Sequence, residues 1–149
     1  MHTRILTLLL AALLGCAAGK SIESRAVLER SPPAERAEVK HILLGYSWLA
    51  SKYRQMGMAL DPRAEYRNET ATEVLAADLQ KQLQGGAAME PLMAQYSEDP
   101  GSAKTGESYP VTPEARLVDP FKQLSLRLQP GEVGIVKSDF GYHVVKRIK

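Results

Sequence analysis

The sequence predicts one α+β domain, and three stretches carry that prediction. Residues 135–149 have the composition of two β-strands around a turn. Residues 39–46 form another run typical of a strand, and residues 69–83 have the apolar period of a helix. With the weaker segments between them, the elements run strand, helices, strand, helix and hairpin. A chain of 149 residues is long enough to bury one hydrophobic core around such a set.

The N-terminus has the features of an export signal. Residues 1–4 are a short basic start, and residues 5–14 are an apolar run too short to cross a bilayer as a helix. The sequence Leu-Leu-Gly-Cys that ends at Cys16 resembles the lipobox of bacterial lipoproteins, in which the cysteine is lipidated and becomes the first residue. We expect a lipoprotein signal peptide over residues 1–15 and a lipid on Cys16. The alternative is a buried cysteine in an ordinary helix.

Residues 16–37 are predicted to be the lipidated cysteine followed by a flexible tether. This stretch is polar and holds Ser31-Pro32-Pro33, a composition typical of linkers. A short helix is expected within residues 23–30. The folded domain is then residues 38–149, and the tether holds it away from a membrane. It begins with a strand at residues 39–46 that contains His41.

Residues 47–68 are rich in apolar side chains but lack a clean period, and Gly57 and Asp61-Pro62 interrupt them. One interpretation is a long insertion that folds back over the core. A second is an exposed apolar surface for unfolded clients or a partner. A third interpretation, a phosphate-binding role, rests on four cations in the segment: Lys52, Arg54, Arg63 and Arg67.

Two helices are predicted after this segment. Thr70 followed by Glu73 fits a capping box at the start of the first, and Gly85-Gly86 ends it. Its apolar face is expected to consist of Val74, Leu75, Leu79 and Leu83. The second helix covers residues 88–96, with an inward face of Met89, Leu92, Met93 and Tyr96.

The next part of the chain alternates between turns and short elements. Residues 97–104 form a loop rich in turn-forming residues, and a short strand is expected within residues 106–111. A helix is predicted over residues 117–128, and Pro130-Gly131 starts the turn into the final hairpin. The inward residues of that helix are expected to be Phe121, Leu124 and Leu128.

The final hairpin places a histidine just inside a strand. Residues 138–141 form the predicted turn, and residues 142–148 form the second strand. Because strand side chains alternate between faces, His143 and Tyr142 point to opposite sides. His41 has a similar setting in the early strand. We expect the fold to bring the two strands together, with both histidines beside one pocket.

Composition and motifs exclude several functional classes. A net charge of +2 is too small to indicate a nucleic-acid-binding protein, and the basic C-terminal residues are interpreted as a solvated strand end. No Gly-x-Ser-x-Gly motif is present, so serine hydrolase chemistry lacks its nucleophile. His41, His143 and Asp99 are of types that bind metals, but nothing in their spacing requires a metal.

Five motifs, in order along residues 38–149, resemble those of the parvulin class of peptidyl-prolyl cis/trans isomerases. They are Val39-Lys-His41-Ile-Leu-Leu, Tyr96-Ser-Glu-Asp99-Pro-Gly-Ser-Ala-Lys-Thr-Gly106, Phe121 before an amphipathic helix, Leu128-Gln-Pro-Gly131-Glu-Val133, and Phe140-Gly-Tyr-His143-Val-Val. Each motif alone is weak, whereas five in the right order are specific. The resemblance implies a parvulin-like α+β fold, a four-stranded antiparallel sheet surrounded by about four helices.

The resemblance also implies roles for individual residues. The expected catalytic residues are the paired His41 and His143 beneath the substrate, and Asp99 beside the reacting carbonyl. The expected substrate-binding residues are Leu117, Phe121, Phe140 and Ser108. No cofactor or metal is expected, because rotation about an amide requires neither.

The chain departs from the family pattern at two adjacent positions. Ser108 stands where the family has a pocket-lining leucine, and Tyr109 stands where it has a glycine. Either the pocket has a different shape, or catalysis is weaker and binding dominates.

Two hypotheses follow. The first is a peptidyl-prolyl isomerase that assists the folding of exported or envelope proteins, anchored through Cys16 in the cell envelope and facing the periplasm or the exterior. The second is a non-catalytic relative, a chaperone or envelope assembly factor that binds extended chains. The expected partners are unfolded or proline-containing polypeptides and the membrane, with no nucleic acid, and we expect a monomer.

Overall fold

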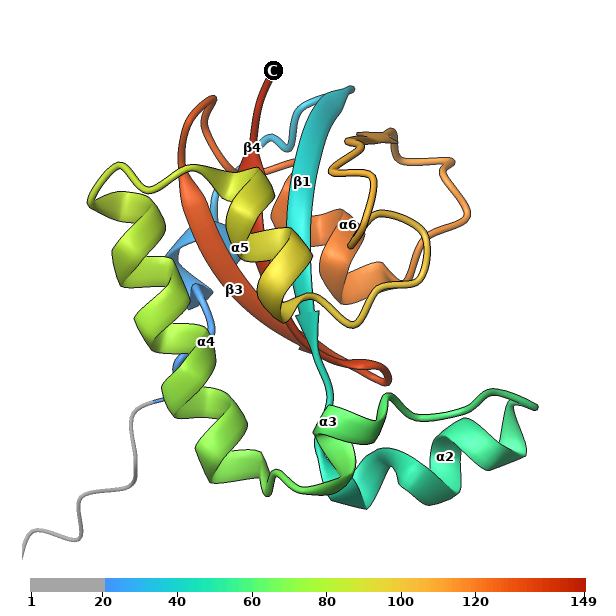
Figure 1. Ribbon diagram of the computed structural model, residues 1–149. Helices are drawn as coiled ribbons and strands as arrows, with labels where there is room; N and C mark the ends of the chain where they lie inside the picture. Colours follow the sequence, from blue (N-terminus) through green and yellow to red (C-terminus); the bar gives the residue numbers. More distant parts are fainter. Residues whose placement is uncertain (1–20) are drawn as a thin grey trace, which may run out of the picture.

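The computed structural model describes residues 21–149, which form a four-stranded antiparallel sheet flanked by helices (Figure 1). The strands lie in the spatial order β2-β1-β4-β3, and each neighbouring pair is antiparallel. Their bounds are β1 (Ala37–Leu44), β2 (Tyr109–Val111), β3 (Val133–Ser138) and β4 (Gly141–Arg147). The predicted α+β fold with a four-stranded antiparallel sheet is therefore confirmed.

Helices cover both faces of the sheet. Helices α4 and α5 pack on one face, and α6 packs on the other (Figure 1). The described part of the chain has more helices than the four expected, because the insertion and the N-terminal segment add short ones. They are α1 (Arg25–Leu28), α2 (Ala50–Gln55), α3 (Pro62–Glu65), α4 (Glu69–Gln84), α5 (Met89–Tyr96) and α6 (Asp119–Ser125), with the 3-10 turn η1 (Ser47–Leu49) before α2.

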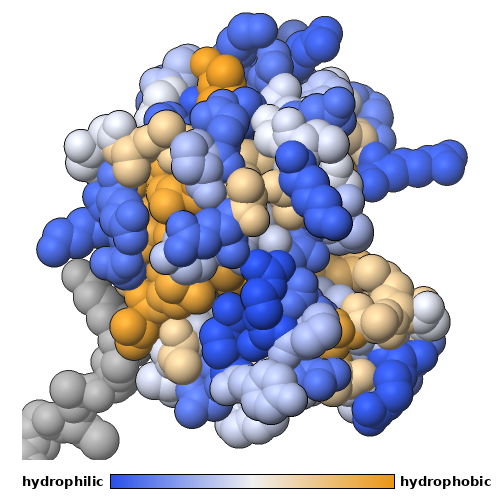
Figure 2. Space-filling model, in the orientation of Figure 1, coloured by the Kyte–Doolittle hydropathy of each residue, from blue (hydrophilic) through white to orange (hydrophobic). Residues whose placement is uncertain are grey.

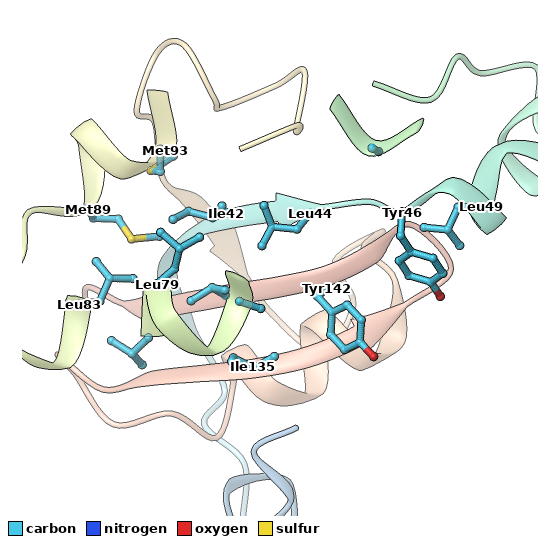
Figure 3. Packing of buried hydrophobic residues seen from close by; sticks show 14 of the residues in the cluster. Ile42, Leu44, Tyr46, Leu49, Leu79, Leu83, Met89, Met93, Ile135 and Tyr142 are labelled. Atoms are coloured by element: carbon cyan, nitrogen blue, oxygen red, sulfur yellow. The ribbon is translucent and has the colours of Figure 1, made fainter. Parts of the chain in front are cut away.

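The larger hydrophobic core lies under α4 and α5 (Figure 3). Ile42 of β1 and Ile135 of β3 pack there against Leu79 of α4 and Met93 of α5, and all four are fully buried. A smaller cluster lies under α6 on the opposite face, and it includes Val39, Val136, Val145, Leu124 and Leu128. Because strand side chains alternate, the second face is also the one toward which the histidines of β1 and β4 project.

Helix α4 begins with a different cap from the predicted one. Its N-cap is Asn68, whose side-chain oxygen accepts a hydrogen bond from the Ala71 amide at 2.8 Å. The Thr70 capping box is therefore wrong. The buried residues of the helix are Thr72, Ala76, Leu79 and Leu83, whereas Val74 is 67% exposed. Small residues at two inward positions contribute little hydropathy, which is why the apolar pattern misplaced part of this face.

Helix α6 is shorter than the predicted 117–128. It spans Asp119–Ser125, with a proline in its first turn, where the missing amide hydrogen costs no hydrogen bond. Leu117 and Val118 therefore precede the helix. Phe121 and Leu124 are buried as expected.

Residues 22–37, assigned from sequence to the flexible tether, lie against the domain instead. Ser24 donates its amide to the Ile135 carbonyl at 2.8 Å, and its Oγ accepts the Ile135 amide at 2.9 Å. Val27 of α1 is buried in the smaller core, and Arg30 forms an ion pair with Glu132 at 2.5 Å. The segment covers the outer edge of β3, which explains why it packs despite its polar composition.

The predicted signal peptide and the lipidation site Cys16 fall within residues 1–20 and lie outside the described residues. Within residues 21–149, no helix has the length and hydrophobicity needed to cross a membrane.

The insertion, residues 47–68, folds back over the core, as the first interpretation predicted. Leu49, Tyr53, Leu60 and Ala64 are buried in the larger cluster. Three of its four cations pair with carboxylates: Lys52 with Asp139, Arg63 with Asp61, and Arg67 with Glu98. The pairing of these cations weakens the phosphate-binding interpretation.

Candidate active site

The register of the sheet places the two histidines beside each other. Leu43 of β1 pairs with His143 of β4, and His41 pairs with Val145, so the two imidazoles are diagonal neighbours on one face. Their Nδ1 atoms are 3.2 Å apart, and their rings are nearly parallel, with an interplanar angle of 15°. Both side chains are buried. The sequence prediction that the fold brings the two strands together is correct.

The turn between β3 and β4 fixes the outer side of His143. Ser138 Oγ lies 2.6 Å from His143 Nε2 and also accepts a hydrogen bond from the Phe140 amide at 3.1 Å. Gly141 has a φ of +125°, and a Cβ at this position would stand 2.2 Å from the Leu44 carbonyl oxygen. Only glycine fits there, so the glycine two residues before His143 is a steric requirement of the turn.

The loop after α5 carries Asp99 to the inner side of His41. The Leu43 amide donates to Ser97 Oγ at 3.1 Å, and the Glu98 amide donates to the Leu43 carbonyl at 2.9 Å, which ties the loop to β1. Asp99 Oδ2 then lies 3.5 Å from His41 Nε2. This separation suits an electrostatic contact and is longer than a normal hydrogen bond.

Three donors converge on the same Asp99 oxygen. Oδ2 accepts from the Ser102 amide at 2.8 Å, the Ser102 hydroxyl at 2.7 Å and the Tyr109 hydroxyl at 2.8 Å. Burial alone raises the pKa of Asp99, but the contacts with His41, Ser102 and Tyr109 outweigh it and hold this pKa below its ordinary value. Asp99 is therefore ionised at neutral pH.

These partners define the tautomers of both imidazoles. The ionised Asp99 favours a proton on His41 Nε2, so His41 Nδ1 is the acceptor that faces His143. His143 then carries its proton on Nδ1 and accepts the Ser138 hydroxyl proton at Nε2. The reverse arrangement would aim a lone pair of His41 at a carboxylate. The chain Ser138–His143–His41–Asp99 is thus directed from the turn to the loop.

Burial keeps His143 neutral. Removal from water, with the neighbouring His41 as a second cause, lowers the pKa of His143 to about 3, although the Asp99 charge acts in the opposite direction. Burial also raises the pKa of Tyr109 to about 12, and its hydrogen bond to Asp99 adds to this shift. Tyr109 is therefore a stable hydrogen-bond donor at neutral pH.

A largely apolar cavity of about 540 Å³ lies above these groups. Phe121 forms one wall, with its ring centroid 4.9 Å from that of His41 and 5.3 Å from that of His143. Tyr109 stands edge-on to His41 at 5.3 Å. Further apolar lining comes from the residues just before α6, the insertion and the β3–β4 turn: Leu117, Val118, Tyr53, Met58, Leu60 and Phe140.

The structure brings together all but one of the predicted catalytic and substrate-binding residues. His41, Asp99, His143, Leu117, Phe121 and Phe140 all line the cavity. Ser108 does not, because its hydroxyl donates to Glu38 Oε1 at 2.6 Å on the neighbouring strand. Tyr109, the next residue, points inward in its place, so the assignment of Ser108 to the pocket was wrong by one residue. A one-residue shift along a strand exchanges its two faces.

Several lining residues were not named from the sequence. Tyr53, Met58 and Leu60 belong to the insertion, whose apolar content was the signal that it contacts something buried. Tyr109 was visible only as a departure from the family pattern. Gly101 is the local reason that its hydroxyl reaches Asp99, since a Cβ there would stand 2.5 Å from the tyrosine oxygen.

The alternative interpretation was a metal site. Within residues 21–149, no group of three or more His, Cys, Asp or Glu side chains is arranged to hold an ion. The Nδ1 atoms of the two histidines face each other, so their nitrogens do not converge with Asp99 on a common point.

The arrangement matches a known class of protein. Residues 24–148 match the family model of the PPIC-type PPIase domain, and the chain belongs to this family of parvulin-type rotamase domains. The match begins at Ser24, in agreement with the packing of the N-terminal segment on β3.

The relatives are folding factors by name. The foldase protein PrsA of Geobacillus kaustophilus is 35% identical over 75 residues, which cover 50% of this chain and 27% of PrsA. The chaperone SurA of Pseudomonas aeruginosa is 38% identical over 85 residues, which cover 56% of this chain and 20% of SurA. The matched region is thus about a quarter or less of each relative's length. The peptidyl-prolyl isomerase ESS1 from Candida albicans shares the fold, with a TM-score of 0.60 over 77% of this chain and 63% of that structure at 19% identity.

Proposed function

We propose that this chain is a peptidyl-prolyl cis/trans isomerase that assists the folding of exported or envelope proteins. The observation that carries the proposal is the cavity, which combines an apolar wall at Phe121 with a floor of two buried, hydrogen-bonded histidines and the ionised Asp99. A prolyl ring fits such a wall, and the polar floor faces the amide that must rotate.

The chemistry needs no bond to break. An X-Pro bond isomerises over a barrier of about 18–20 kcal/mol because the planar amide is stabilised by resonance, with partial negative charge on its oxygen. The twisted amide has lost much of that charge separation. An apolar cavity therefore disfavours the planar state relative to the twisted one, which lowers the barrier by differential binding of the transition state.

The polar groups on the cavity floor add an electrostatic contribution that depends on the orientation of the substrate carbonyl. Phe121 and Leu117 hold the prolyl ring, and the charge of Asp99 repels the carbonyl oxygen most strongly when the amide is planar. Three fixed donors and His41 hold that carboxylate in place. Because the hydrogen-bonded groups are ordered before substrate arrives, little reorganisation accompanies the rotation.

A protease-free isomerisation assay on short X-Pro peptides tests the proposal. We expect a rate above the uncatalysed one for the wild type, and a lower rate for Asp99→Asn, which keeps the side-chain shape but removes its charge. If the wild type shows no rate enhancement although circular dichroism shows that it is folded, a binding function without catalysis would replace the proposed isomerase function.

A second candidate is a chaperone that binds extended chains without catalysis. It is favoured by exposed apolar and aromatic side chains on the insertion: Trp48, Met56, Met58 and Tyr66, which are 75%, 40%, 40% and 89% exposed. Figure 2 shows moderately apolar surface where the segment after α2 lies, next to hydrophilic surface. Methionine side chains adapt to many partners, as a binder of varied clients requires. Suppression of aggregation by wild type and by Met56→Ser, measured apart from isomerisation, tests this candidate.

The proposal extends to the location of the protein. The lipobox-like sequence before Cys16 supports a lipid anchor in the cell envelope, with the domain facing the periplasm or the exterior. Several acyl chains on one residue give stable membrane attachment. In detergent partitioning, the wild type should enter the detergent phase and Cys16→Ser should remain aqueous; equal aqueous partitioning would contradict the anchor.

A further inference from the structure

Helix α2 of the insertion contacts the turn between β3 and β4 at two successive positions. The Tyr53 hydroxyl donates a hydrogen bond to the Phe140 carbonyl at 2.9 Å, and the two rings meet edge-on, with centroids 5.9 Å apart at 85°. The preceding residue, Lys52, forms an ion pair with Asp139. Tyr53 is buried, and burial raises its pKa to about 12, so the hydroxyl remains a donor at all physiological pH values.

The same turn residue is held on its other side by the polar chain of the active site. The Phe140 amide donates to Ser138 Oγ, and that hydroxyl lies 2.6 Å from His143 Nε2. Phe140 therefore has its carbonyl bound by the insertion and its amide bound by the group that orients His143. Tyr53 lies two hydrogen bonds away from Ser138 and three away from the imidazole.

The peptide that Tyr53 holds joins the tip of the turn to Gly141, which pairs with Ser138 across the hairpin. Glycine leaves the Phe140–Gly141 peptide plane freer to rotate than any other residue would. Without the Tyr53 hydroxyl, the carbonyl is free to turn toward water, and the Phe140 amide and the Ser138 hydroxyl can move with it. The Ser138 hydroxyl, together with His41 and Asp99 at the other end of the polar chain, determines which nitrogen of His143 carries the proton.

We propose that Tyr53 is a positioning residue, through which the insertion holds the β3–β4 turn and so fixes the tautomer and orientation of His143 and His41. This inference deepens the proposed isomerase function and rests on it. It gives the insertion a role beyond covering the core, because one of its buried side chains completes the support of the histidine pair from outside the sheet.

The molecule supplies a matched control for the Tyr53 hydroxyl. Tyr142 is also buried, and its hydroxyl donates to Glu73 at 2.6 Å, but it lies on the opposite face of β4, under α4. Tyr53→Phe and Tyr142→Phe each remove one tyrosine hydroxyl and leave the ring. A merely structural role for Tyr53 predicts that both variants lose stability and neither loses activity per folded molecule.

We expect Tyr53→Phe to lower kcat roughly three- to ten-fold, the size associated with one neutral hydrogen bond, with little change in KM because the ring still lines the cavity. Tyr142→Phe should keep the wild-type kcat. Nitrogen-15 NMR of the imidazoles should show one fixed tautomer for His143 in the wild type and in Tyr142→Phe, and a mixture of tautomers in Tyr53→Phe. Both measurements are made well below the melting temperature of each variant.

Wild-type kcat together with unchanged His143 nitrogen shifts in Tyr53→Phe would overturn the inference. Equal losses of kcat in the two phenylalanine variants would also overturn it. The NMR measurement needs no substrate, so it tests the positioning role even if the wild type proves inactive, and an inactive wild type counts against the proposed function alone. Lys52→Ala, which breaks the exposed ion pair at the same turn, should change kcat less than Tyr53→Phe.

Discussion

The two faces of the sheet are built from alternate residues of the same strands, yet their environments differ. The face under α4 and α5 is an apolar core, where Ile42, Val144 and Leu79 pack without a histidine. The face under α6 has a smaller apolar cluster, and beside it lie His41 and His143, buried and hydrogen-bonded to each other. One face buries the larger apolar cluster, and the other also buries polar groups, whose removal from water is unfavourable unless they are hydrogen-bonded.

This division explains why a buried polar pair persists in a small domain. Burial of two imidazoles without partners would be unfavourable, and the contacts with Ser138 and Asp99 offset that cost. Substitutions on the α4 face should therefore change folding with little effect on activity, and substitutions on the histidine face should do the reverse. The four predictions below test that separation, beginning with the largest effect.

Leu79→Ala should lower the free energy of unfolding by about 2–5 kcal/mol, because it leaves a cavity in the larger core. Leu79 is fully buried, whereas Val74 on the same helix is 67% exposed. Val74→Ala should change the free energy of unfolding by less than about 0.5 kcal/mol. Urea denaturation gives both values, and the isomerase rate per folded molecule should be unchanged in each variant. A loss of that rate in folded Leu79→Ala would show that the two faces are coupled.

His143→Ala should lower kcat/KM between about ten-fold and a hundred-fold, because His41 loses the partner that fixes its tautomer and position. Lys146 lies on the same strand with its side chain toward the other face, and Lys146→Ala should keep the wild-type rate. The protease-free peptide assay measures both. Full activity in a folded His143→Ala would show that the apolar walls catalyse alone.

The histidine face should also set the acid sensitivity of folding. Above the ordinary pKa of 6.5, His143 is neutral in both states; below it, the unfolded chain gains a proton that the folded protein, with a pKa of about 3, does not. The unfolded state then binds more protons, so the free energy of unfolding falls as pH drops from 6.5 toward 3. Asp99, whose pKa is also lowered, adds a loss of the same sign below its ordinary value of 3.8.

Urea denaturation of the wild type and of His143→Ala tests this pH dependence. The midpoints are measured at roughly pH 7, 5.5 and 4, which span the window. The variant should show the shallower decline. Parallel curves for the two proteins would mean that other groups cause the acid sensitivity.

The sequence predicted the α4 face less accurately than the histidine face, although the former is the simpler one. Strand alternation and the parvulin-like motifs placed His41, Asp99, His143 and Phe121 together, and the structure agrees. Helical periodicity placed Val74 inward, and the structure exposes it. The motifs combine residues from several elements. Hydropathy along one helix gives little weight to small residues such as Ala76, which is fully buried in the larger core.

Contacts between segments far apart in the chain could not be predicted. The packing of Ser24 on β3 depends on an open sheet edge that exists only after the strands assemble. The hydrogen bond from Tyr53 to Phe140 joins residues that no local pattern relates. In both cases a polar or irregular segment is ordered by a partner that the local sequence does not reveal.

The smallest expected effect on the isomerase rate is that of a substitution at Ser108. Ser108 and its neighbour Tyr109 point to opposite faces of the sheet. Ser108 is directed at Glu38, and its hydroxyl is the largest cause of the lowered pKa of that carboxyl; Tyr109 faces the cavity and binds Asp99. Ser108→Leu should leave kcat/KM for Leu-Pro or Phe-Pro peptides unchanged, because the new side chain stays outside the cavity. Tyr109→Phe keeps the ring against His41 but removes one of the donors to Asp99, so it should lower the rate. A several-fold rise with Ser108→Leu would mean that residue 108, and not Tyr109, forms the cavity wall.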